Sequence, residues 1–405
     1  MKRRLWIGLI GLGLLGVASA ITVWSVVRSW RSNFEDAVRR LDQDGAPVEP
    51  GRMAPPQVPD AENAALLIVE AARLLDALKD EDKPELDGLP DEEGQDPETL
   101  KPYLEKCRGA LEKLNEALRR PRCRFPIDYA AGVEAELHGV TSIVEFARLL
   151  HARAVLLLRA GDRAAAAQDL RSILRLSESL SQEPMLICQL IRYSVVGEAF
   201  DLLKRDRLVL PEQEWKNLAA AFEAPAYGDV FARSFLMERA VAIDVCRKYF
   251  IAGQVPGGGR NAMRTGSAGG HLGVRSATKY LRDIARAIEL VRKPYVEARA
   301  GEAELQNDVE RGRSVTDFLS LLLWPAVVRS HQREAAAEAQ CRMAAAFCRI
   351  KAAGLVPETF EVADPCTGKP LLYKRLEKGF ELRSPGPNQA DDGGAEDDIV
   401  LKSPK

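Results

Sequence analysis

Four aspartates and a serine close to the C-terminus are the residues of this sequence best suited to bind a metal ion. They stand around the adjacent glycines 393 and 394 and comprise Ser384, Asp391, Asp392, Asp397 and Asp398. Calcium is held by several oxygen ligands at about 2.3–2.6 Å, supplied by carboxylates and carbonyls on flexible backbone. These five residues are therefore the candidate calcium site of the sequence. Acidic tails whose charges stay in water are the more common case, and this is the interpretation that the sequence favours.

The histidines are few and do not form a recognisable metal or catalytic motif. His138, His151, His271 and His331 are scattered, and none belongs to an H-E-x-x-H pattern. His151 shares the apolar face of a predicted helix, which favours a hydrogen-bonded core residue over a ligand. His331 and Glu334 have the i, i+3 spacing that is typical of a pair on a helix surface.

Motifs for nucleophilic or phosphate chemistry are also missing. The chain has no Gly-x-Ser-x-Gly elbow, and the glycine-rich segment 253–273 lacks the Gly-Lys-Ser/Thr ending of a phosphate loop. No pair of acids can be selected as an acid/base dyad from the sequence alone. We therefore favour a protein that is not an enzyme, and a hydrolase with an unmarked site in a helical cleft is an alternative.

The seven cysteines favour buried thiols over metal or redox sites. No C-x-x-C pattern exists, which argues against a zinc ribbon or a thioredoxin-like motif. Cys341 and Cys348 share a helix face, but seven residues of helix hold them too far apart to bond. We expect small buried hydrophobes. A disulfide between Cys107 and Cys123 remains an alternative if this part of the chain is exported.

The first thirty residues predict a transmembrane signal anchor. Three basic residues at 2–4 precede a run from Leu5 to Val27 that carries no charge over 23 residues. As a helix this run is about 34 Å long, enough to cross a hydrocarbon layer of about 30 Å. The small residues 18–20 also fit a cleavage site, so a cleaved signal peptide is the alternative. The basic start favours a single pass through a bacterial inner membrane with a periplasmic body.

Helices are expected over most of the remaining chain. Residues 31–60 contain five prolines after residue 46 and predict an extended tether. Residues 61–330 predict a stack of helical hairpins, because apolar residues recur at helical spacing and no alternating strand pattern appears between 126 and 250. The acidic segment 80–98 and the glycine-rich segment 253–273 are predicted surface loops.

The C-terminal part changes character. An alanine-rich helix is expected over 331–353, followed by two short strands at 371–374 and 379–382 that form a hairpin. The predicted fold class is therefore mainly α, with an N-terminal transmembrane helix, an irregular hairpin stack and a small C-terminal α+β module at 331–401.

Two segments resemble known families. Residues 147–180, with their Ala154-x-x-x-Leu158-x-x-Gly161-Asp162 turn, resemble one tetratricopeptide helical hairpin. Residues 331–400 resemble the C-terminal region of the major pseudopilin of bacterial type II secretion. The shared features are the alanine-rich helix, a D-P-x-x-G-x-P-L-x-Y segment at 364–373, a Ser-x-Gly turn at 384–386 and Asp-Asp-Ile at 397–399. In that family the loop binds calcium, so the resemblance implies calcium here. The chain as a whole is similar to membrane-anchored bacterial proteins.

Composition limits the classes of partner. The 57 basic residues nearly balance 59 acids, which argues against a nucleic-acid binder, and 6% aromatic residues argue against a platform of stacked rings. The sequence favours a membrane-anchored, extracytoplasmic helical scaffold that binds an unidentified protein. The alternatives are a pseudopilin-like component of an envelope or secretion assembly with a calcium-binding loop, and the hydrolase.

Overall fold

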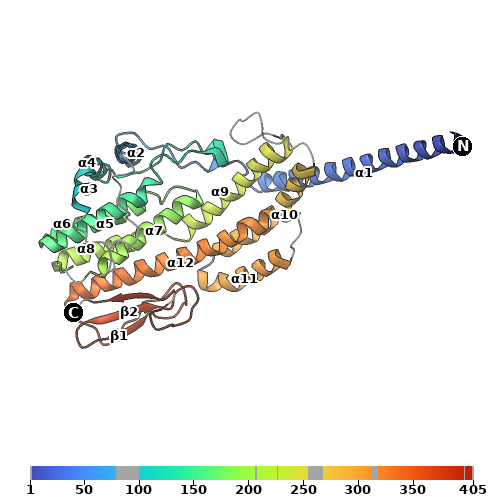
Figure 1. Ribbon diagram of the computed structural model, residues 1–405. Coiled ribbons are helices and arrows are strands. Elements are labelled where there is room, and N and C mark those ends of the chain that lie inside the picture. The colour runs from blue at the N-terminus through green and yellow to red at the C-terminus, as the bar shows by residue number, and fades with distance from the viewer. Residues whose placement is uncertain are drawn as a thin grey trace.

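The computed structural model describes residues 2–78, 100–205, 208–225, 227–253, 268–311, 318–395 and 397–403, with backbone only for 2–21, 23, 268–271, 318 and 321–327. The chain is mainly helical, and one small sheet lies near its C-terminus (Figure 1). This confirms the predicted mainly α class with a small α+β part at the end of the chain.

Twelve α-helices are present in the described ranges. They are α1 (Lys2–Gln43), α2 (Ala64–Asp76), α3 (Lys101–Lys106), α4 (Arg108–Ala117), α5 (Ser142–Ala160), α6 (Arg163–Glu178), α7 (Leu186–Leu203), α8 (Glu212–Glu223), α9 (Asp229–Val245), α10 (Ala268–Val291), α11 (Tyr295–Arg311) and α12 (Phe318–Ala353). Short turns η1 (Pro50–Met53) and η4 (Tyr129–Glu134) and a π-helical turn η5 (Cys246–Ile251) complete the helical part.

The predicted hairpin around residue 161 is present as α5 and α6. Gly161 ends α5 in the left-handed region at φ 86°, which suits glycine because it has no Cβ. The Asp162 side chain then accepts a hydrogen bond from the Ala165 N–H and caps α6. Further helices continue the stack, with α6 against α7, α7 against α12 and α12 against α8. These helices run along the long direction of the molecule (Figure 1).

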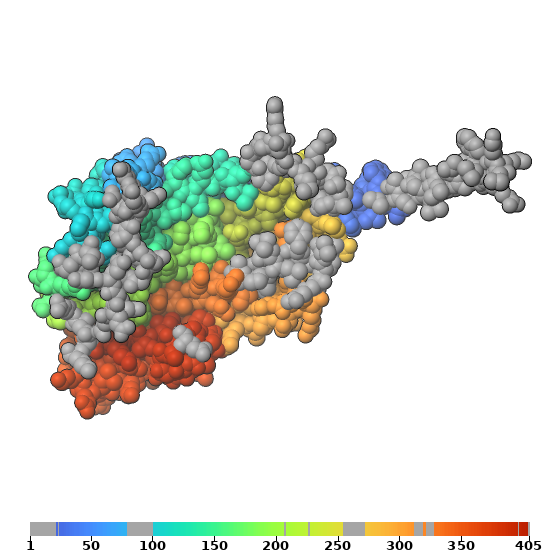
Figure 2. All heavy atoms as spheres, in the orientation of Figure 1, coloured from blue at the N-terminus to red at the C-terminus, as the bar shows by residue number. Residues whose placement is uncertain are grey.

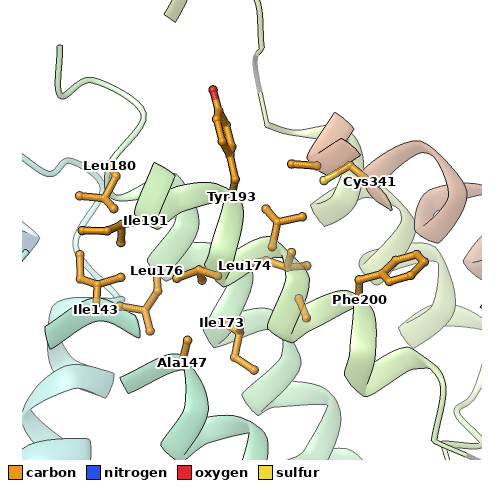
Figure 3. Packing of buried hydrophobic residues seen from close by; sticks show 14 of the residues in the cluster. Ile143, Ala147, Ile173, Leu174, Leu176, Leu180, Ile191, Tyr193, Phe200 and Cys341 are labelled. Atoms are coloured by element: carbon orange, nitrogen blue, oxygen red, sulfur yellow. The ribbon is translucent and has the colours of Figure 1, made fainter. Parts of the chain in front are cut away.

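The core is continuous from α2 to the sheet. Its buried side chains include residues from Ala64 to Leu401. Figure 3 shows the part where Ile143 and Ala147 of α5 meet Ile173 and Leu176 of α6. Each large apolar side chain that leaves water stabilises the fold by about 1.5–3 kcal/mol. Interlocked helices with one shared core provide a rigid frame for surface sites.

The second half of α1 is attached to the body. Phe34 and Val38 are buried in a separate cluster with Ile243, Leu281 and other residues of α9, η5 and α10. The Arg247 guanidinium pairs with the Glu35 carboxylate at 2.8 Å beside this cluster. Toward its N-terminus α1 leaves the body as a long rod (Figure 1).

A three-stranded antiparallel sheet closes the chain. Its strands are β1 (Leu372–Arg375), β2 (Phe380–Ser384) and β3 (Ile399–Lys402), in the order β1-β2-β3. The predicted hairpin is confirmed as β1 and β2. The strand β3 corrects the prediction, which placed its first residues in the acidic loop. Phe380 and Leu382 point to α12, where the Phe347 ring lies 5.4 Å from that of Phe380.

Several predicted boundaries differ from the structure. Helix α12 begins at Phe318 and continues through Pro325, whereas the sequence analysis began it at 331. Helix α10 begins at Ala268, inside the predicted loop 253–273. The proposed tether packs on the body, because Val48, Pro50 and Pro55 are buried. The predicted loop 80–98 and residues 254–267 lie outside the described residues.

Two further expectations concern the membrane and the thiols. Among the residues whose side chains are described, no helix has the length and apolar character needed to cross a bilayer. Most of the predicted span, residues 5–27, lies outside that set. All seven cysteines lie in the described ranges, six of them buried, and no disulfide joins Cys107 to Cys123 in this structure.

Candidate functional site

The first residues of the predicted calcium site lie where β2 ends. The Ser384 hydroxyl donates to a carboxylate oxygen of Asp364 at 3.0 Å and accepts a hydrogen bond from the Gly386 N–H. The Asp397 carboxylate accepts the Asn388 N–H at 2.8 Å. Both polar side chains therefore stabilise the turn that connects β2 with β3.

The other three aspartates lie further along the same loop. Oδ2 of Asp398 accepts the N–H groups of Asp392 and Gly394, and Asp391 pairs with Arg383 at 2.9 Å. No group of three histidine, cysteine or acidic residues suited to a metal ion occurs among the residues that the structure describes. Oδ1 of Asp398 is buried without a hydrogen-bond partner. The calcium site stays a prediction.

A second cluster of titratable groups is buried between α11, α12 and the start of α9. His331 Nδ1 lies 2.5 Å from Glu302 Oε1, and His331 Nε2 lies 3.6 Å from Glu334 Oε2. The Gly228 N–H donates to Oε1 of Glu334 at 2.7 Å. Burial raises the pKa of Glu334 to about 7. The expectation of a surface pair is wrong, because His331 is only 1% exposed and Glu334 5%.

This buried cluster is positioned to stabilise the fold. The rings of Phe231 and Tyr295 lie 5.4 and 5.2 Å from the imidazole of His331 and cover it. Reacting groups must reach a substrate, and these groups lie inside the protein. His151 is similar: it is buried and its Nδ1 lies 2.9 Å from Glu198, which confirms the predicted core histidine.

One spacing with chemical meaning escaped the sequence analysis. Ser276 and Lys279 on α10 have the Ser-x-x-Lys spacing of some serine nucleophiles. Ser276 is buried and accepts the Leu319 N–H, whereas Lys279 pairs with Asp283 at 2.8 Å. The lysine is therefore paired with an acid on its own helix, and the two residues do not form a nucleophilic dyad.

The clearest binding geometry is a pocket of about 660 Å³ between segment 55–58, the turn after α4 and the end of α6. Asn63, the N-cap of α2, joins the first two walls by accepting the Arg124 N–H and donating to the Arg124 carbonyl, each at 2.9 Å. Arg124 also donates to the Pro55 carbonyl at 3.0 Å. Hydrogen bonds to backbone therefore fix the shape of this pocket.

A second pocket of about 550 Å³ shares Leu118 and Arg175 with the first. It lies between the end of α4 and the facing sides of α5 and α6, and its lining includes Arg119. The Arg153 guanidinium crosses from α5 to Asp169 of α6 with two hydrogen bonds of 2.6 and 2.9 Å. This bidentate pair holds the two helices of the hairpin together beneath the pocket.

Positive charge is in excess around both pockets. The two carboxylates that line them are already paired, Asp169 with Arg153 and Glu178 with the buried Arg192. The remaining charged residues that line them form what we call the arginine site: Arg119, Arg120, Arg122 and Arg175. A chain with a net charge of −2 thus gathers four guanidinium groups at one place.

The arginines of this site have few acidic partners. Arg120 donates to the carbonyls of Asp60 and Asn63, and Arg175 donates to the carbonyl of Leu118. These bonds position the guanidinium groups and leave their charge unneutralised. Arg122 lies 3.6 Å from Glu62, and both side chains are largely in water, where such a pair contributes little.

The sequence contained a local signal for the arginine site. Residues 119–124 read R-R-P-R-C-R, four arginines within six residues. The overall charge of the chain is close to zero and conceals this cluster. Arg175 has no such signal, because it belongs to α6 and reaches the site through its hydrogen bond to the Leu118 carbonyl.

Comparison with known proteins gives no relative. No family model matches the chain, and neither a curated protein nor a solved structure is significantly similar to it. The resemblances to a tetratricopeptide hairpin and to the pseudopilin C-terminal region therefore stay predictions.

Proposed function

We propose that this protein is a membrane-anchored, extracytoplasmic helical scaffold that presents its body to a protein partner. The observation that carries the proposal is the course of α1. It is one helix from Lys2 to Gln43. Three residues after the charge-free run ends at Val27, Trp30 lies under the Arg275 guanidinium, and the next residue, Arg31, donates to the Ile251 carbonyl.

Exposed apolar residues at the same point of α1 support this proposal. Trp24 is 61% exposed and Val26 is 40% exposed, and both belong to the last turn of the charge-free run, next to the body. The Arg28 guanidinium lies 5.2 Å from the centre of the Trp24 ring. Tryptophan with a neighbouring arginine is typical of the interface between lipid and water. A bilayer around residues 5–27 would place Trp24 there.

The position of the arginine site on the body, relative to α1, supports a partner outside the membrane. Helices α3, α4 and α6 lie at the end of the body opposite α1 (Figures 1 and 2). The arginine site belongs to that distal end. A scaffold held by α1 would therefore offer this site to the surrounding compartment.

Extraction from bacterial membranes with alkaline carbonate tests the anchor. We expect the full chain to stay in the pellet and a Leu14→Arg, Leu15→Arg variant to be released, because each arginine in mid-span costs about 2.5–3.5 kcal/mol. A Ser29→Arg, Ser32→Arg variant, changed on the exposed part of α1, is the matched control and should stay in the pellet. Release of the unchanged chain, or an N-terminus at Ile21, would contradict the proposal.

A second candidate function is a pseudopilin-like envelope component ordered by calcium. Two observations favour it: α12 lies against β2 and β3, and Oδ1 of Asp398 is buried in the loop without a partner. Calcium should then raise the Tm, and a chelator or Asp398→Asn should abolish the rise. Glu377→Asn, in the turn between β1 and β2, is the control. A Tm that calcium leaves unchanged would remove this candidate.

A further inference from the structure

We propose that the arginine site binds an acidic, extended segment of a protein partner. The proposal deepens the proposed function and rests on it, since it names the chemistry of the partner that the scaffold would hold. It is carried by the pocket geometry and the unbalanced charge together.

Charge complementarity selects an anion. The acids that line the pockets are engaged by Arg153 and Arg192, so the lining cannot neutralise its own cations. Arg119, Arg120 and Arg175 form no ion pair with a carboxylate among the described residues. A carboxylate ligand would supply the missing charge through paired hydrogen bonds to planar guanidinium groups.

The size and lining of the site favour a peptide chain over a small ion. The two pockets measure about 660 and 550 Å³ and meet at Leu118 and Arg175. Each of these volumes exceeds the volume that a single phosphate ion fills. Pro55, Pro56 and Val58 add apolar surface on one side, suited to the side chains between the acids of a peptide. Several acids in an extended chain would reach more than one guanidinium at once.

Nucleic acid and lipid fit the site less well. None of the residues that line the two pockets is aromatic, so bases would find no ring to stack on. Lipid headgroups of the membrane that holds α1 would lie at the opposite end of the body (Figure 1). An acidic protein segment in solution needs neither an aromatic ring to stack on nor a site close to the membrane.

The site is also held in shape before a ligand arrives. Arg120 donates to the carbonyls of Asp60 and Asn63 at 2.7 and 2.9 Å, and Arg175 donates to that of Leu118 at 2.7 Å. A guanidinium has five donors, so these bonds leave others for a ligand. Side chains that are already ordered lose less conformational entropy on binding, which raises affinity.

Fluorescence anisotropy of the detergent-solubilised full chain tests the proposal. The probe is a fluorescein-labelled peptide of alternating Glu and Ser, compared with the same peptide carrying Gln in place of Glu. We expect the acidic peptide to bind about tenfold or more tightly than the Gln peptide and to weaken as salt rises. A single-stranded oligonucleotide and anionic phosphatidylglycerol vesicles are measured as competitors, and neither should displace the peptide at equal charge concentration.

Matched variants connect binding to the site. Arg119→Ser with Arg175→Ser should weaken the acidic peptide about tenfold, whereas Arg163→Ser with Arg333→Ser removes the same charge from exposed positions outside the pockets and should leave binding unchanged. Circular dichroism confirms that each variant is folded, and Arg119→Ser alone serves if the double variant is not. Equal binding of the two peptides, equal loss in both variants, or displacement by the oligonucleotide or vesicles would overturn the proposal. Because the measurement is made in detergent, it is independent of whether α1 is an anchor.

Discussion

At the scale of residues, the pair of His331 with Glu302 connects α12 to α11, and the pair of Arg153 with Asp169 connects α5 to α6. A buried charge without a partner lowers the stability of the fold. Removing one member of such a pair is therefore more destabilising than replacing both members by apolar residues. These groups specify how neighbouring helices meet.

The buried carboxyl of Glu334 should make stability depend on pH. Burial raises its pKa to about 7 in the folded chain, above the unfolded value of 4.5. The resulting stabilisation is complete below about pH 4.5 and is lost as pH rises through about 7. Glu334→Gln keeps an acceptor for the Gly228 N–H and removes this loss. Relative to the unchanged chain, the variant should gain about 1–3 kcal/mol between about pH 5 and about pH 8.

Urea unfolding over that pH range measures the effect. Glu238, whose pKa burial also raises to about 7, contributes the same slope in both proteins and cancels in the difference. Glu297→Gln, at an exposed position of α11, is the control and should follow the unchanged chain. A Glu334→Gln variant with the same pH slope as the unchanged chain would show that this carboxyl is already ionised in the fold.

At the scale of elements, the helix ends that could be predicted are those marked by a capping residue in the local sequence. The Gly161 and Asp162 pair marked the turn between α5 and α6 because a left-handed glycine and an N-cap are local requirements. The alanine-rich helix was expected from 331, whereas α12 begins at Phe318 and continues through Pro325 as one helix. The burial of His331 was not predicted, because i, i+3 spacing describes neighbours on one helix only, whereas its partner Glu302 belongs to α11.

The attachment of α1 depends on one small apolar cluster. Phe34→Ala should remove its largest buried ring, and such a loss typically costs about 3–5 kcal/mol. We expect faster hydrogen exchange at backbone amides of residues 30–43 and of α10, measured by mass spectrometry. Peptide binding at the arginine site should not change, since the site lies at the other end of the body.

A matched change on the exposed part of α1 checks that prediction. Val26→Ala removes an apolar side chain that is not buried against the body. Its exchange pattern in α10 should equal that of the unchanged chain. Unaltered exchange in Phe34→Ala would mean that other contacts, such as the pair of Arg247 with Glu35, are sufficient to hold α1.

At the scale of the whole molecule, the fold class was predictable and the arginine site was not. Apolar residues recur at helical spacing along most of the chain. A wrong boundary for one helix therefore does not change the predicted fold class. The arginine site joins segment 55–58, the turn after α4 and the end of α6, which only tertiary packing brings together. Its one local signal, R-R-P-R-C-R, is weak until the acids that would neutralise it are seen to be engaged elsewhere.

The account of the whole molecule depends on α1 lying in lipid while the helical body stands outside it. Photolabelling of bacterial membranes with a carbene reagent confined to the bilayer, followed by peptide mapping, tests this most directly. We predict label within residues 5–27 and none in α3, α4 and α6, which lie at the end of the body opposite α1 (Figure 1). Absence of label from residues 5–27, or a mature chain that begins at Ile21, would contradict the account.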